Sequence, residues 1–184
     1  MVDQLILWDQ SLMVFLNNLG SPTYDGLWLF LTKQFYWSPY FAVILYLTYT
    51  KLGTKNFLYL LLFTTLLLMV TDQSANLFKN YFMRLRPCNE PALEGLIRVI
   101  KSSDTYSFYS GHATNSMATT VLVFSLLRPY YKYAPLLFLF PLIFAYSRIY
   151  LGLHYPGDIL TGYFFGAGYG YLTYRLYRKF ILKD

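Results

Sequence analysis

Three of the residues best suited to polar chemistry lie close together in a chain that is otherwise strongly apolar. His154 follows Arg148 by six residues and precedes Asp158 by four, in the stretch SRIYLGLHYPGD. A carboxylate at this spacing can hold the imidazole in one tautomer, which leaves the other ring nitrogen as a base or nucleophile. A guanidinium suits oxyanions, because its planar fork donates two hydrogen bonds. The alternative is that both are ordinary helix-end residues. Arg148 would then anchor the end of a membrane span, and Asp158 would cap the helix that begins near Pro156.

The second histidine of the chain, His112, follows Ser110 and Gly111 at the start of an apolar run. The tripeptide alone is a weak signal, since Ser110 or His112 could simply cap a helix. Its functional interpretation is an anion site, because free N–H groups at a helix start point at phosphate oxygens and glycine lets the backbone approach them.

A third polar cluster closes a long apolar run and contains Lys79, Arg84 and Arg86. Considered alone, these residues are best explained as an interfacial basic cluster whose long side chains extend towards lipid headgroups. The cluster gains meaning if the topology brings it to the same membrane face as the two histidines, because ionisable residues at a membrane boundary are functional candidates.

The composition indicates a membrane protein. Of the 184 residues 56% are hydrophobic and 13% are charged, whereas soluble domains carry about a quarter charged residues. The length predicts a single domain over 1–184, and the N-terminus lacks the basic region of a cleavable signal peptide. A single cysteine, Cys88, excludes an internal disulfide and a cysteine-based metal site.

Apolar windows predict an all-α integral membrane protein with a bundle of five, or at most six, transmembrane helices within 27–177. The predicted spans are 27–50, 57–79, 113–127, 134–147 and 159–177, with the second extended to about Met83 and the fourth towards Tyr150.

Residues 1–20 predict a different kind of helix, one that lies in the membrane interface. An amphipathic helix packed on the bundle is equally compatible with the pattern. The apolar residues at helical spacing are Leu5, Trp8, Leu12, Phe15 and Leu19.

The charges predict the orientation. The net charge of +6 could suggest nucleic acid as a partner, but its distribution favours membrane topology and no nucleic acid. Basic residues concentrate in the two short connections between spans and in the tail, which the positive-inside rule assigns to the cytoplasm together with the C-terminus. The N-terminus, an outer loop over 88–109 and the 148–158 turn then share the periplasmic face. The orienting residues are Lys51, Lys55, Arg128, Lys132, Arg175, Arg178, Lys179 and Lys183.

Metal binding is the competing chemical interpretation, since two histidines and Asp158 could form a facial triad. Three basic side chains at the same face, Lys79, Arg86 and Arg148, would repel a cation and attract an anion. The sequence therefore predicts a phosphoryl site without a metal or a cofactor.

The ordered pattern K-x6-RP, SGH and SR-x5-H-x3-D resembles the type 2 phosphatidic acid phosphatase (PAP2) superfamily, in its branch of bacterial membrane lipid phosphatases. The resemblance covers the chain from the second to the fifth predicted span, and the opening WDQSLMVFLNNLGSPTYDGLW also looks like bacterial members. Many members have proline before Ser-Gly-His, whereas this chain has Tyr109, which bears on the loop and on substrate fit.

The resemblance implies a role for each matching residue. His154 would be the nucleophile that forms a phosphohistidine, and Asp158 would orient it. His112 would be the acid for the leaving group and then the base for water. The residues expected to hold the phosphate oxygens are Lys79, Arg86, Ser110, Gly111 and Arg148.

The expected function is hydrolysis of a lipid phosphate or diphosphate on the outer face of a bacterial inner membrane. Undecaprenyl diphosphate, lipid A phosphate, phosphatidylglycerol phosphate and phosphatidate are candidate substrates, and the first two are favoured. A lipid-to-lipid phosphotransferase is the alternative, and a non-catalytic lipid-binding protein is disfavoured because it would need neither histidine. The oligomeric state stays open, as does the role of Asp72. A structural hydrogen bond with Gln73, Ser74 or Asn76 is expected, and a substrate-side role is the alternative.

Overall fold

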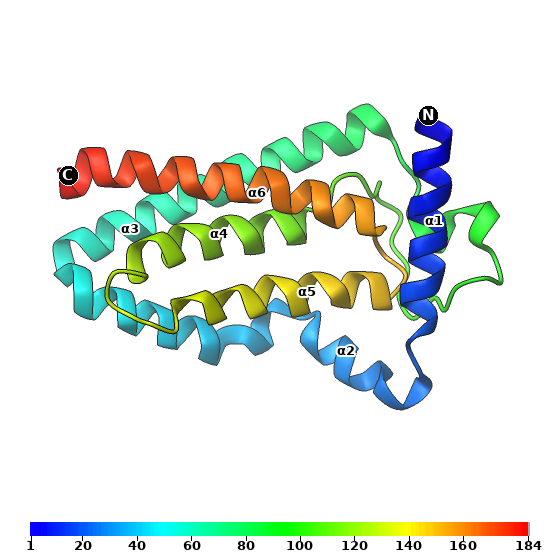
Figure 1. The fold of residues 1–184 in the computed structure, drawn as a ribbon, viewed down its shortest axis with the longest axis horizontal. Helices are drawn as coiled ribbons and strands as arrows, with labels where there is room; N and C mark the ends of the chain where they lie inside the picture. Colours follow the sequence, from blue (N-terminus) through cyan, green and yellow to red (C-terminus); the bar gives the residue numbers. More distant parts are fainter. Residues whose placement is uncertain (184) are drawn as a thin grey trace.

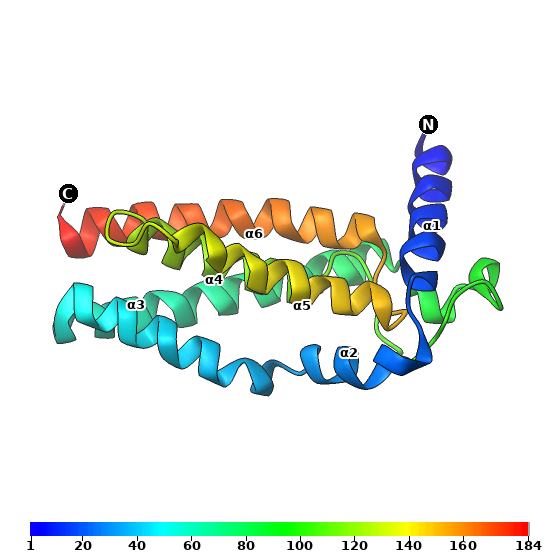
Figure 2. The same cartoon turned by 60° about the horizontal axis from the view of Figure 1, so that its bottom comes forward.

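In the computed structural model, which describes residues 1–183, the chain forms helices and connecting loops, with no strand in this range. The long helices lie side by side, and α1 crosses one end of their bundle (Figures 1 and 2). The α-helices are α1 (Val2–Asn18), α2 (Asp25–Leu31), α3 (Ser38–Phe82), α4 (Gly111–Leu127), α5 (Leu139–Tyr150) and α6 (Pro156–Tyr177). Short 3-10 helices cover Pro22–Tyr24, Gln34–Trp37, Pro87–Asn89, Pro91–Leu93 and Ala134–Phe138, and a π-helical turn covers Arg178–Leu182.

Helix α3 is a hairpin rather than a straight rod. Gly53 has φ 70° and ψ 168°, a backbone conformation that interrupts the helix and that glycine adopts without steric cost. The chain reverses there, so that 38–52 and 54–82 form two arms (Figure 1). By length and hydropathy, the helical region Gln34–Leu93 is able to cross a membrane, and Ala134–Tyr150 is a shorter apolar helix.

The predicted span 27–50 is wrong in its first part, because it is not one helix. Helix α2 ends at Leu31, and Lys33 has extended backbone angles (φ −86°, ψ 113°) before α3 begins at Ser38. Pro39 lies in the first turn of α3, where its missing N–H costs nothing. The apolar composition of the segment hid this interruption.

The other predicted helices lie close to their expected places. Helix α3 ends at Phe82, with Met83 in the left-handed conformation that commonly terminates a helix. The fourth apolar run begins as a 3-10 helix and continues as α5 to Tyr150, as expected. Helices α4 and α6 start slightly earlier than predicted, at Gly111 and Pro156.

Helices α4 and α6 make the closest contact in the bundle because α6 presents glycine at every fourth residue. A Cβ atom at each of these glycines would collide with a backbone carbonyl oxygen of α4 or of its N-cap residue, Ser110. Small residues at this spacing are typical of closely packed membrane helices. The opposed pairs are Gly162 with Ser110, Gly166 with Thr114, and Gly170 with Ala118.

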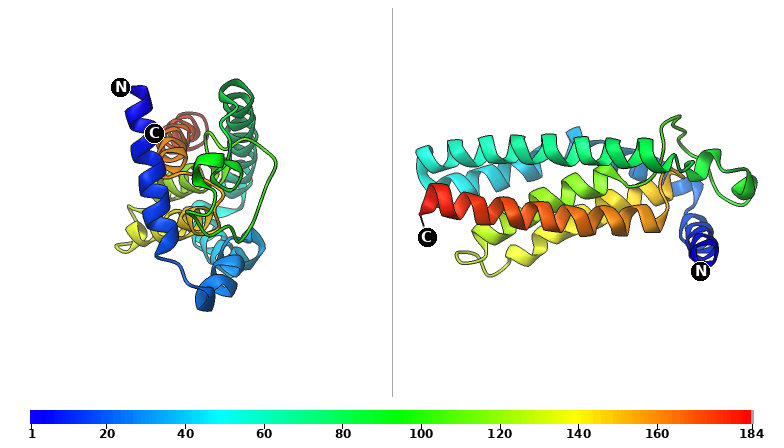
Figure 3. Two further views of the ribbon diagram at one scale, coloured as in Figure 1. Left: turned by 90° about the vertical axis from the view of Figure 1, so that its right-hand side faces the viewer. Right: turned by 90° about the horizontal axis from the view of Figure 1, so that it is seen from above.

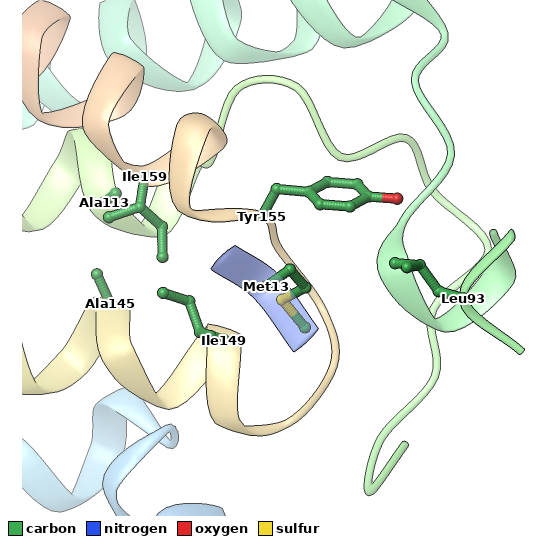
Figure 4. Close-up of a cluster of buried hydrophobic side chains, with 7 residues drawn as sticks. All are labelled: Met13, Leu93, Ala113, Ala145, Ile149, Tyr155 and Ile159. Atoms are coloured by element: carbon green, nitrogen blue, oxygen red, sulfur yellow. The ribbon is translucent and has the colours of Figure 1, made fainter. Parts of the chain in front are cut away.

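Helix α1 fastens the outer loop to the end of α5. The Nδ2 group of Asn17 donates to the carbonyl oxygens of Arg98, Ile149 and Tyr150 at 3.1, 3.1 and 2.9 Å, while its Oδ1 accepts from the Arg98 N–H at 2.7 Å. Met13, fully buried, joins a hydrophobic cluster that links α1, α5, α6 and the loop (Figure 4).

The apolar stripe of α1 faces away from the bundle. Its five residues are each 44–63% exposed, so the packing alternative raised by the sequence does not describe this face. Viewed end-on, α1 lies across the bundle end (Figure 3). The buried face of the helix instead carries Met13 and Asn17. The stripe is Leu5, Trp8, Leu12, Phe15 and Leu19.

The α4–α6 contact predicts a sharp difference between two neighbouring glycines. Gly166→Ala places a methyl group 2.5 Å from the Thr114 carbonyl oxygen, whereas nothing lies within 4 Å of a Cβ at Gly168. We expect Gly166→Ala to destabilise the protein by about 1–3 kcal/mol through overpacking, and Gly168→Ala to be neutral or slightly stabilising. Thermal unfolding in detergent compares them, and equal melting temperatures would contradict the close contact.

Candidate active site

The three polar clusters of the sequence meet at the end of the bundle that α1 crosses. Arg86 Nη1 lies 3.1 Å from His154 Nε2, and His154 Nδ1 lies 3.3 Å from Asp158 Oδ2. The backbone N–H of Ser110 donates to the carbonyl oxygen of Asp158 over 3.2 Å. Residues from the segment that follows α3, the N-cap of α4, the α5–α6 turn and the first turn of α6 therefore form one site.

The local sequence around His154 explains its orientation. Pro156 occupies the first turn of α6, and Asp158 Oδ2 accepts a hydrogen bond from the Tyr155 N–H at 3.0 Å in a capping arrangement. The same oxygen faces His154 Nδ1. Asp158 thus caps the helix and orients the imidazole with one carboxyl group.

The surroundings of His154 favour the neutral form of its imidazole. It is 1% exposed, and burial lowers the pKa of His154 well below its usual value, with further lowering by Arg86, Arg148 and Lys79. The hydrogen-bond partners assign the ring proton to Nδ1, opposite Asp158, and leave Nε2 to accept from Arg86. Nε2 therefore carries the lone pair that a nucleophile needs.

Arg86 is held rigidly beside that nitrogen. Its Nε and Nη2 donate to the carbonyl and hydroxyl oxygens of Thr105 at 2.7 and 2.8 Å, and its Nη1 donates to the Leu153 carbonyl oxygen at 2.9 Å. The outer loop and the α5–α6 turn thus fix a buried guanidinium in advance, which favours stabilisation of charge without reorganisation.

Arg148 is held less completely. Its Nη1 donates to the Thr32 hydroxyl at 2.6 Å, while its buried Nε has no hydrogen-bond partner among residues 1–183. Buried polar groups are normally paired, so this N–H is available to an anionic oxygen. Thr32 lies in the break between α2 and α3, which gives that interruption a role in positioning Arg148.

A cavity of about 550 Å³ reaches the site from inside the bundle. Lys79, Gly111 and His112 line one end of it, and His112 is exposed into this space. The buried pair His154 and Arg86 does not line the cavity. The structure thus divides the predicted residues between a wall that faces the cavity and a layer behind it.

Ser110 serves as the N-cap of α4. Its side chain is fully buried and accepts from the Ala113 N–H at 3.4 Å. The N–H groups of Gly111 and His112 belong to the first turn, where no intrahelical acceptor exists. Accepting this hydrogen bond leaves the O–H of Ser110 free as a donor, so phosphate binding by Ser110 stays a prediction beside that by the backbone N–H groups.

Two residues of the site were missed by the sequence analysis. Arg84 donates to Asp158 Oδ1 at 2.9 Å and to Asp9 Oδ2 at 2.7 Å, and its guanidinium lies 3.7 Å from the Tyr155 ring centroid. Asp9 Oδ1 accepts from the Gly157 N–H at 2.7 Å. Arg84 was visible as a member of the basic cluster, but nothing in the local pattern pointed to Asp9.

Asp72 is paired differently from the expectation. Its Oδ1 accepts from Asn115 Nδ2 at 2.7 Å, across the cavity wall from α4. Gln73, Ser74 and Asn76 were the expected partners, and Ser74 instead contacts the Tyr109 hydroxyl at 2.5 Å. The sequence favoured near neighbours, whereas helix packing supplied the actual partner.

Tyr109, the departure from the usual proline, anchors the loop that leads into α4. It is fully buried, and its ring stacks on Phe165 with centroids 5.2 Å apart. Together with the Ser74 contact, it ties the loop to α3 and α6. The substitution thus replaces a rigid residue by a packed and hydrogen-bonded one.

The basic side chains of the site favour an anionic ligand over a cation. Within residues 1–183, no group of three His, Cys, Asp or Glu side chains is placed to hold a metal ion. The prediction of a metal-free mechanism stays a prediction, tested by chelation below.

Sequence comparisons place the chain among known phosphatases. Residues 56–182 match the PAP2 superfamily. The chain is 31% identical to a lipid A 4'-phosphatase of Bacteroides thetaiotaomicron, over 97% of this chain and 81% of the relative. It is 28% identical to an undecaprenyl-diphosphatase of Sulfolobus acidocaldarius, over 95% of this chain and 81% of the relative.

The fold is similar to two solved structures. A transmembrane PAP2 type phosphatidylglycerolphosphate phosphatase from Bacillus subtilis matches with a TM-score of 0.74 and 17% identity, over 96% of this chain and 88% of that one. Aquifex aeolicus LpxE matches with a TM-score of 0.68 and 20% identity, over 90% and 93%. The chain therefore belongs to the PAP2 superfamily and is a phosphoric monoester hydrolase.

Proposed function

We propose that this protein is an integral-membrane lipid phosphatase that acts on the outer face of a bacterial inner membrane through a phosphohistidine intermediate. The observation that carries the proposal is the placement of His154, which is buried, with Nδ1 facing Asp158 and Nε2 facing Arg86.

In the first step, Nε2 of His154 attacks phosphorus and the bond from phosphorus to the lipid oxygen breaks. Asp158 keeps the Nδ1 proton in place and balances the positive charge of the phosphorylated ring. Arg86 and Arg148 stabilise the charge on the phosphoryl oxygens. His112, at the cavity end, donates a proton to the departing lipid oxygen.

In the second step, His112 takes a proton from a water molecule whose oxygen attacks phosphorus. The phosphorus–nitrogen bond breaks, and inorganic phosphate leaves as His154 returns to its neutral form. Lys79 and the N–H groups of Gly111 and His112 hold the phosphate oxygens from the cavity side. Both steps use groups of this chain alone.

The membrane arrangement follows the charge pattern. We assign the two arms of α3, together with α4, α5 and α6, as five membrane spans, with the C-terminus in the cytoplasm. The exposed stripe of α1 lies in the outer interface. The site then sits at headgroup level, where a lipid phosphate reaches it while its chains enter the cavity.

Lipid A phosphate and undecaprenyl diphosphate are the substrates that we favour, since relatives at 31% and 28% identity carry those names. Phosphatidylglycerol phosphate and phosphatidate are further candidates. Release of inorganic phosphate, as opposed to a newly phosphorylated lipid, separates hydrolysis from phosphotransfer.

The two histidines should fail at different steps. His154→Asn should lower turnover at least about 1,000-fold and form no phosphoenzyme, because the nucleophile is absent. His112→Asn should accumulate phosphoenzyme from p-nitrophenyl phosphate, whose leaving group needs no acid while hydrolysis still needs a base. Quench experiments that trap acid-labile phosphohistidine measure both.

Both assays are run with and without EDTA, and wild-type activity should be unchanged. Phosphoenzyme in His154→Asn would contradict the nucleophile assignment. Loss of wild-type activity in EDTA would contradict the metal-free mechanism.

The neutral state of His154 predicts a pH-dependent stability. Its pKa is lower in the folded protein than the unfolded value of about 6.5. Below pH 6.5 the unfolded chain therefore binds more protons than the folded protein, and the free energy of unfolding decreases as the pH is lowered. Wild type should lose more stability than His154→Asn between pH 7.5 and 5.5, because only the wild-type chain gains this proton on unfolding. Thermal unfolding at both pH values measures this, and equal losses would contradict the neutral ring.

Asp9 should support catalysis from outside the reacting groups. Asp9→Asn leaves Arg84 without its second carboxylate and should slow phosphohistidine formation about 10-fold, with the protein still folded. Asp3→Asn, an exposed change in the same helix, is the matched control and should behave as wild type. Single-turnover kinetics compare the two variants. Equal rates of phosphohistidine formation would show that Asp9, and with it α1, does not support catalysis.

A further inference from the structure

The cavity that reaches the active site has a polar zone in the middle of its wall. Lys79, Gly111 and His112 line one end of the cavity. Its other end is lined by aliphatic side chains. The polar zone consists of Asp72, Asn76 and Asn115. It lies between the phosphate end of the cavity and the aliphatic end. The aliphatic residues include Ile44, Leu45, Leu60, Leu61 and Leu68.

The polar zone lies at a defined depth below the phosphate end. Asp72 and Asn76 precede Lys79 by seven and three residues on α3, which puts all three on one helix face. With a rise of about 1.5 Å per residue, Asp72 lies about 10 Å along the helix from Lys79. Asn115 lies one turn beyond His112 on α4.

Asp72 retains unused hydrogen-bonding capacity. A carboxyl group at membrane depth is costly unless it is functional or well paired. Asn115 Nδ2 supplies one hydrogen bond to Oδ1 at 2.7 Å, whereas the two carboxylate oxygens offer about four acceptor positions. Asp72 is exposed and lines the cavity, so the remaining positions are open to a ligand.

Two hydroxyl groups deeper in the cavity wall donate within their own helices. Thr48 donates to the Ile44 carbonyl oxygen at 2.9 Å, and Thr64 donates to the Leu60 carbonyl oxygen at 2.8 Å. These threonines satisfy their own helices. Asn115 Oδ1 is a second acceptor of the polar zone, because it is buried and has no hydrogen-bond partner among residues 1–183. Asp72 and Asn115 together therefore offer open acceptor positions to a ligand.

We propose that the polar zone binds a hydroxyl or amide N–H group that the substrate carries between its phosphate and its hydrocarbon chains. This inference rests on the proposed function and narrows its substrate class. It favours an acylated amino-sugar phosphate, whose hydroxyl and amide groups lie within about 10 Å of the phosphate. A polyprenyl diphosphate carries no donor there, so its hydrocarbon would cover Asp72 and leave the carboxyl group unpaired.

The test compares kcat/KM for three probes on the full-length protein in detergent. The probes are a glucosamine 4-phosphate lipid with amide-linked hydroxyacyl chains, undecaprenyl diphosphate, and p-nitrophenyl phosphate, which is too short to reach the polar zone. Asp72→Leu should lower the preference for the amino-sugar lipid over the polyprenyl diphosphate about tenfold, with p-nitrophenyl phosphate hydrolysis unchanged. Asp72→Asn, which keeps an acceptor oxygen, should retain most of the preference.

The matched control is Gln73→Leu, a polar-to-leucine change at the next residue, which does not line the cavity; it should behave as wild type. A wild-type preference for the polyprenyl diphosphate, or an equal loss on both lipids in Asp72→Leu, would overturn the inference. Binding of both lipids to His154→Asn, with and without Asp72→Leu, is measured in parallel. If the protein bound the two lipids with different affinities but wild type hydrolysed neither, the phosphatase proposal would be overturned and the inference about the polar zone would stand.

Discussion

The end of the bundle is organised around one fully buried carboxyl group, that of Asp158. A buried charge is tolerated only when donors surround it, and its donors come from separate parts of the chain. Arg84 comes from the segment between α3 and the outer loop, and Tyr155 and His154 come from the α5–α6 turn. The nucleophile is thus one of several groups that satisfy this carboxyl, so its orientation is a by-product of a structural requirement.

The same requirement makes the N-terminal helix part of the site. Asp9 binds Arg84 and the Gly157 N–H, and a Cβ atom at position 157 would lie 2.7 Å from the Asp9 carboxylate oxygen. The glycine is therefore needed for α1 to approach. A helix whose other face presents apolar side chains to its surroundings thereby contacts, through one carboxylate, the segment that carries His154.

The sequence was informative where a property is local and less so where it depends on packing. Apolar runs located the helices, and three motifs predicted which polar segments meet, because residue spacing and hydropathy are written along the chain. The interruption at Lys33 was missed, since aromatic residues there are as apolar as a span. The pairing of Asp72 with Asn115 and the contribution of Asp9 arise from neighbouring helices, which no local pattern specifies.

The glycines of α6 have a consequence for assembly. A contact that repeats every four residues is satisfied again if α6 slides along α4 by four residues, about 6 Å. The repeated small residues therefore allow the two helices to approach closely but do not fix their register. The bond from the Ser110 N–H to the Asp158 carbonyl oxygen exists in one of these alignments. Formation of the site and selection of the helix register are therefore the same event, and a bundle assembled one turn out of place would be compact yet inactive.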